Sequence, residues 1–138
     1  MKAAQTLLST ALYTSGILGL QILLMDRWLW NAAPIHAYGL IVFVVIDGAL
    51  LVVMQGQTGL ATIGAALISA AQLASMLGDI AVGQPSGVSV GSFGSYLLAD
   101  TAFISLLATQ AVILALATAA LTMPVVHNHR LAMSQIKN

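Results

Sequence analysis

Cysteine and glutamate are both absent from the 138-residue sequence. Without cysteine, the chain has no disulfide, no thiolate ligand for a metal and no thiol nucleophile. Charged residues are also scarce, at 6% of the chain, whereas about a quarter of the residues of a soluble domain are charged. The sequence contains no Walker-type loop and no basic stripe. These absences argue against a stand-alone enzyme and against a protein that binds nucleic acid.

Apolar residues dominate the composition. The chain is 59% hydrophobic with a mean hydropathy of +0.98, which predicts that a lipid bilayer is its solvent. Four apolar stretches are long enough to cross a bilayer as helices, and no strand alternation competes with them. We therefore expect an all-α integral membrane protein, a four-helix antiparallel transmembrane bundle in one domain over 1–138. The predicted spans are about 3–25, 36–54, 59–80 and 96–123.

One carboxyl lies in the middle of the second predicted span. At about 1.5 Å of rise per residue, Asp47 lies roughly 16 Å along the helix from His36, close to the midplane of a core about 30 Å thick. A carboxyl at that depth costs about 3 kcal/mol on insertion scales, so it needs a polar partner, water or a proton. Asp47 is therefore the main polar feature of the predicted bundle.

Two interpretations of Asp47 stay open. The eleven-residue spacing puts His36 and Asp47 on one helix face, as the mouth and the middle of a proton or cation path. In the structural alternative, Asp47 is protonated and bonds Gln72, Ser69 or a threonine of a neighbouring helix, while His36 sits at the interface.

The third predicted span has two distinct faces. A polar stripe is predicted by residues at alternating steps of three and four: Thr62, Ala65, Ser69, Gln72, Met76 and Asp79. Small residues recur at strict four-residue steps on the other face: Ala66, Ala70, Ala74 and Gly78. Such a ladder lets helix backbones approach closely in lipid, so we expect it to pack this span.

The segment 81–95 is rich in glycine and serine and predicts a surface loop, with a re-entrant segment or a partner contact as alternatives. In the span that follows, Asp100 is expected in the first turn, where the helix dipole favours a carboxylate. Pro124 is expected to end that span. His127 and His129 then fall in a short interfacial tail.

One histidine and three carboxylates are predicted near one membrane face and are candidate metal ligands: Asp26, His36, Asp79 and Asp100. This donor set suits a transition metal in type, but no His-x-x-x-His or Glu-x-x-His pair puts two ligands on one helix face. Haem ligation would need a second intramembrane ligand, and only His36 lies close to a span. We expect no metal and no cofactor.

Basic residues suggest an orientation. Lys2, Arg130 and Lys137 share one side of a four-span protein, and Arg27 lies on the other. By the positive-inside rule both termini are cytoplasmic, in a multi-pass protein of the cell membrane.

Two functions remain as expectations. The first is a non-catalytic accessory or structural subunit of a larger membrane complex, of which respiratory or other redox assemblies are examples, held by small-residue helix faces that also permit self-association. The alternative is a small proton- or cation-coupled transporter or channel that uses Asp47. The ion path or buried polar network would comprise Asp47, His36, Gln72, Asp79 and Asp100.

Overall fold

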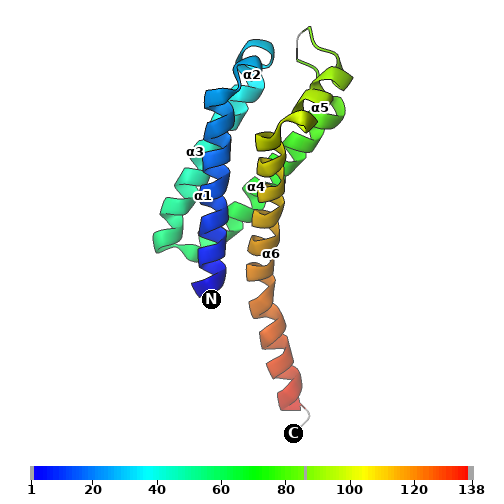
Figure 1. Ribbon diagram of the computed structural model, residues 1–138. Helices are drawn as coiled ribbons and strands as arrows, with labels where there is room; N and C mark the ends of the chain where they lie inside the picture. The colour runs from blue at the N-terminus through cyan, green and yellow to red at the C-terminus, as the bar shows by residue number, and fades with distance from the viewer. Residues whose placement is uncertain (1, 86, 137–138) are drawn as a thin grey trace.

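Six helices make up the described part of the chain (Figure 1). The computed structural model describes residues 2–85 and 87–136, with side chains for 3–85 and 87–122. The helices are α1 (Lys2–Met25), α2 (Arg27–Ala32), α3 (Pro34–Gly56), α4 (Thr58–Val82), α5 (Val90–Ala99) and α6 (Thr101–Ile136). No strand occurs in these residues, so the all-α prediction is confirmed.

Four helices of the described chain are long and apolar enough to cross a membrane. The apolar segments are Ala3–Met25, Pro34–Gly56, Thr58–Val82 and Thr101–Thr122, with mean hydropathies of 1.6, 2.5, 1.7 and 2.1. Large aliphatic side chains such as Leu24, Val45 and Leu67 are 64–78% exposed, which fits a surface that faces lipid. The first three predicted spans agree with these segments to within two residues.

The last predicted span, 96–123, begins too early. Residues 96–99 belong to α5, because Asp100 has extended backbone (φ −81°, ψ 110°) and separates α5 from α6. At the other end the apolar segment reaches Thr122, the last residue whose side chain is described, and the helix continues through Pro124 to Ile136, so Pro124 does not end it. A proline costs a helix one hydrogen bond and often kinks it, but it does not end every helix. The side chains of the predicted histidine tail lie outside the described residues.

The predicted loop at 81–95 is mostly helical. Helix α4 continues to Val82, residues 83–89 connect, and α5 begins at Val90. Ser89 caps α5, accepting a hydrogen bond from the backbone N–H of Ser92 (3.3 Å). The glycine content has a packing role, because a Cβ on Gly94 would lie 2.5 Å from the carbonyl oxygen of Ile80. Glycine here lets α5 lie directly against the backbone of α4, so its presence does not indicate a turn.

The long helices pack around two apolar clusters. Helix α1 lies against α3 and α6, and α4 lies against α3, α5 and α6. Figure 1 shows α2 and α5 at one end of the molecule, with the start of α1 and the end of α6 directed to the other. The cluster toward α2 and α5 includes Leu29, Ala37, Met76, Phe93 and Leu106. The cluster toward the opposite end includes Leu8, Leu12, Met54, Ala61, Ala65, Ile113 and Ala117.

The face of α4 that packs within the chain is not the predicted one. The small-residue ladder is expected to pack this helix, but the polar stripe does so. The polar stripe faces inward, with Ser69, Gln72 and Met76 buried. Of the small-residue ladder, Ala70 and Ala74 are exposed, whereas Ala66 is partly buried against the apolar cluster that includes Leu12, Met54 and Ile113, and Gly78 is partly buried, so the middle of the ladder does not pack α4 within the chain. Polar side chains are costly in lipid unless they find partners inside the protein. The polar face of the helix therefore turns inward, and the alanine face turns outward.

Candidate functional site

The Asp47 carboxyl lies inside the fold. Asp47 is 2% exposed and comes from the middle of α3, a helix that Pro34 begins at its first turn. Ser15 of α1 donates a hydrogen bond from its hydroxyl to Asp47 Oδ2 at 2.5 Å. Gln110 of α6 donates from Nε2 to the same Ser15 oxygen at 2.6 Å. Three helices therefore share one buried chain of hydrogen bonds, from amide to hydroxyl to carboxyl.

The partners of Asp47 differ from those proposed from sequence. Gln72 and Ser69 are buried on α4, but Asp47 bonds Ser15 of α1. Helix α3 packs against both α1 and α4, and chain order alone does not decide which of them its acid faces. A sequence signal for Ser15 and Gln110 does exist. Each continues the three- and four-residue spacing of the buried face of its helix, after Leu8 and Leu12 in α1 and after Phe103 and Leu106 in α6.

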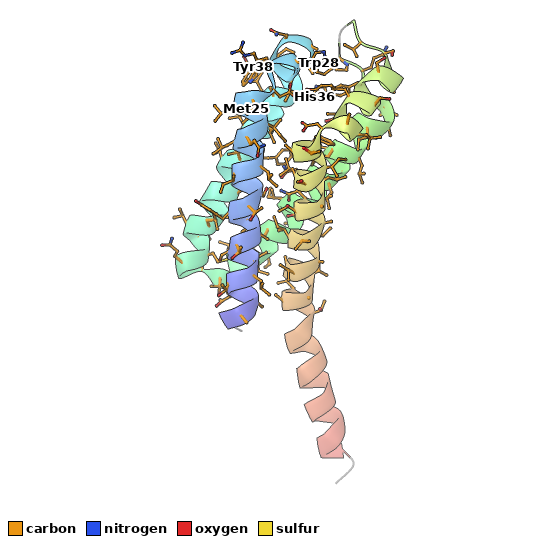
Figure 2. All side chains as sticks on the ribbon, viewed as in Figure 1. Met25, Trp28, His36 and Tyr38 are labelled. Carbon is orange, nitrogen blue, oxygen red and sulfur yellow. The ribbon has the colours of Figure 1, made fainter. Side chains whose placement is uncertain are left out.

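His36 and Asp79 form the second polar pair. His36 Nε2 lies 3.1 Å from Asp79 Oδ1, and the two side chains are 27% and 26% exposed. The His36 ring also meets Phe93 edge-on, with ring centroids 5.1 Å apart. The pair joins the start of α3 to the end of α4 at the end of the molecule near α2 and α5, where Figure 2 labels His36. His36 and Asp47 are thus on one helix, but they have different partners.

Two further carboxylates at this end accept hydrogen bonds from backbone N–H groups at the starts of helices. Asp26 caps α2, with Oδ1 accepting from the N–H of Leu29 at 2.9 Å, and its Oδ2 accepts from the Tyr96 hydroxyl. Asp100 lies just before α6, not within the first turn as predicted, and accepts from the N–H of Ala102 at 2.8 Å. Burial, and then the hydrogen bond to Asp26, raise the pKa of Tyr96 above its ordinary value of 10.0.

Aromatic rings join α2 to α5. The Trp28 ring lies 4.0 Å from the Tyr96 ring and 6.0 Å from the Phe93 ring, measured between centroids. Trp30 is turned outward and meets Tyr38 edge-on at 5.7 Å. Trp28 is thus part of the protein's own packing, whereas Trp30 and Tyr38 have the exposed position of an interfacial belt. Figure 2 labels Trp28 and Tyr38 at this end of the molecule.

A cavity of about 330 Å³ lies between these groups. Four of the five residues singled out from sequence line it, namely His36, Gln72, Asp79 and Asp100, whereas Asp47 does not. The walls are otherwise mainly apolar, and three phenylalanines, Phe43, Phe93 and Phe103, contribute to them. A mainly apolar cavity with a few convergent polar groups is the usual form of a small-molecule site.

Polar groups occur at successive levels from the cavity to the middle of α3. Gln72 lies about 10 Å along α4 from Asp79, and Asp47 lies about 16 Å along α3 from His36. Beyond Asp47, toward the opposite end, the apolar cluster around Leu12, Met54 and Ile113 fills the interior. The polar groups therefore reach the centre from one end of the molecule, and an apolar layer separates them from the other.

Metal and nucleophile chemistry find little geometric support. Within 2–85 and 87–122, no three histidine, aspartate or glutamate side chains are close enough to hold a metal ion. Residues 87–91 do carry a Gly-x-Ser-x-Gly spacing, which in α/β hydrolases presents a serine nucleophile on a strand-to-helix turn. Here Ser89 caps a helix and its hydroxyl lies 2.7 Å from that of Ser92, while His36, the histidine whose side chain is described, pairs with Asp79.

Comparisons with protein-family models, with curated proteins and with solved structures give no match to this chain. Its function is therefore argued from its own side chains.

Proposed function

We propose that this chain crosses the cell membrane four times as an antiparallel bundle, with both termini cytoplasmic, and acts as a non-catalytic subunit of a larger membrane complex. Four apolar helices of spanning length support the membrane placement. The short connections support a subunit role, since they leave little of the chain outside the bilayer for an independent activity.

The observation that carries the subunit proposal is the outward-facing ladder of α4. Ala70 and Ala74 are exposed, on the side of the helix opposite its buried stripe. Helix α6 repeats the arrangement, with Ala111 and Ala115 exposed. In lipid, association of helices depends on close van der Waals contact, which small side chains permit. The exposed alanines therefore support docking on helices of another chain.

A matched pair of variants tests this docking. Ala70→Phe with Ala74→Phe places two large rings on the ladder, while Val45→Phe with Val52→Phe makes the same addition on exposed positions of α3. After purification from native membranes in mild detergent, the α4 variant should lose partner chains that the α3 variant and the wild type retain. A wild-type preparation that runs as a small homo-oligomer with no other chain would contradict the subunit proposal.

A second candidate, proton or cation transport through Asp47, is supported by the polar groups at successive levels from the cavity to the middle of α3. Transport would also require the apolar layer beyond Asp47 to open. Asp47→Asn separates the two functions, because it keeps the shape of the side chain and removes its titration.

The two functions predict different results for Asp47→Asn. Under transport, pH- or cation-driven flux in reconstituted vesicles should disappear while expression stays normal. Under the subunit function, the variant should assemble and any host complex should keep its activity. Wild-type vesicles without proton or common-cation flux would remove the support for transport.

A further inference from the structure

The cavity contains two buried polar atoms that have no hydrogen-bond partner among the described residues: His36 Nδ1 and Gln72 Oε1. Both residues line the cavity wall. Gln72 is 2% exposed, so bulk water does not reach its carbonyl oxygen. An acceptor left unpaired in an apolar interior is costly, and such atoms in a cavity wall point to a group that completes them.

The chemistry of both atoms is set by their surroundings. In the tautomer that fits this contact, His36 Nε2 donates to the Asp79 carboxylate, which lies 3.1 Å away. Nδ1 is then a lone-pair acceptor. The amide oxygen of Gln72 is an acceptor in every state. The cavity therefore offers two acceptors, and its occupant must bring two donors.

The wall residues and their charge further limit the class of ligand that the cavity can hold. Phe43, Phe93 and Phe103 favour a flat ring, and a cavity of about 330 Å³ is within the usual range for small molecules. The carboxylates of Asp26, Asp79 and Asp100 also line it, which disfavours an anion. The long helices around it are apolar enough to lie in a membrane, which favours a neutral, lipid-soluble occupant.

We propose that this cavity binds a lipid-soluble aromatic diol of the 1,4-hydroquinone type, with one hydroxyl donating to His36 Nδ1 and the other to Gln72 Oε1. Gln72 lies about 10 Å along α4 from Asp79, the partner of His36, so the two acceptors come from different levels of the bundle. The two para hydroxyls of such a ring point in opposite directions and can therefore donate to acceptors at different levels.

Trp28 provides an internal probe of binding. It stacks on Phe93, a wall residue, with 6.0 Å between ring centroids. Trp30 is the other tryptophan and faces outward, so Trp30→Phe leaves Trp28 as the single reporter. The ligands are a decyl-substituted 1,4-hydroquinone and its dimethyl ether, which keeps the ring and tail but has no donor. Ascorbate holds the diol reduced, and a chain without cysteine is unaffected by it.

In detergent micelles, the diol should give a saturable change in Trp28 fluorescence, with the ether binding at least about tenfold more weakly. Gln72→Leu should lower the affinity for the diol about tenfold and leave the affinity for the ether unchanged, because the substitution removes one hydrogen-bond acceptor from the cavity. Gln21→Leu is the matched control, since Gln21 is exposed and does not line the cavity. It should bind both ligands as the wild type does.

Gly39→Leu keeps the test decisive if Gln72→Leu fails to fold. Gly39 lines the cavity, and a Cβ there meets nothing within 4 Å, so a leucine fills the space without a clash at the backbone. It should abolish binding of both ligands while the thermal midpoint holds or rises. Equal affinity of wild type for the diol and the ether, or wild-type diol affinity in Gly39→Leu, would overturn the proposal.

Discussion

Ser15 is the point at which the buried hydrogen-bond chain can be cut with the smallest change. Its side chain is 1% exposed, and its hydroxyl both donates to Asp47 (2.5 Å) and accepts from Gln110 (2.6 Å). Ser15→Ala removes one oxygen and leaves an acceptor on Asp47 and a donor on Gln110 without this partner. The substitution creates no clash, so the loss of these two bonds dominates its effect.

The size of the effect follows from the environment. A buried polar group left unsatisfied costs about 1–3 kcal/mol in a water-soluble fold. Hydrogen bonds between membrane helices measure lower, about 0.6 kcal/mol on average and about 1.7 at most, because separated helices find other partners in lipid. With two bonds lost, we expect Ser15→Ala to lower the free energy of unfolding by about 1–3 kcal/mol.

Reversible unfolding in mixed micelles measures this loss. Ser9→Ala is the matched control: it is the same substitution on the same helix, and Ser9 donates only to the weak sulfur acceptor of Met54 at 2.9 Å. The control should cost less than about 0.5 kcal/mol. In a Gln110→Leu background the cost of Ser15→Ala should shrink, because one of the two bonds is already gone. A Ser15→Ala cost no larger than that of Ser9→Ala would refute the reasoning.

Two further predictions concern α5. Gly94→Ala should destabilise the protein by about 1–3 kcal/mol in the same unfolding assay, because its Cβ would press on the Ile80 carbonyl, whereas Gly91→Ala, with nothing within 4 Å, should not. Equal effects of the two would contradict the close contact of α5 with α4. In a Tyr13→Phe/Tyr38→Phe variant, Tyr96 is the remaining tyrosine, and ultraviolet titration should give a tyrosinate midpoint above 10.0 that Asp26→Asn lowers. The pKa of Tyr96 is higher in the folded protein than in the unfolded one, so its contribution to stability is complete below pH 10 and is lost as the pH rises through the folded-state pKa. A midpoint at 10.0 would contradict the burial of Tyr96 and its hydrogen bond to Asp26.

Much of the architecture could be predicted because lipid imposes simple rules on sequence. Apolar length identified three spans to within two residues, and periodicity separated the two faces of α4, although the polar face and not the expected alanine ladder faces inward. The same composition rules fail at both ends of the predicted loop at 81–95, where α4 continues to Val82 and α5 begins at Val90. In the structure Gly94 is a contact between two backbones, and neither composition nor periodicity distinguishes that use of glycine from a turn.

The sequence by itself determined that Asp47 needs a partner, because an acid at the centre of an apolar span is costly wherever the neighbours lie. It also determined that His36, Asp79 and Asp100 would be near one end, because helical rise sets the depth of each residue. Which helix faces which was decided by tertiary packing. Ser15 bonds Asp47 across 32 residues of sequence and Gln110 bonds Ser15 across 95, while Gln72 lines the cavity. Periodicity gives the buried side of each helix, but the partner across the interface depends on how all the helices pack together, and no local pattern records that arrangement.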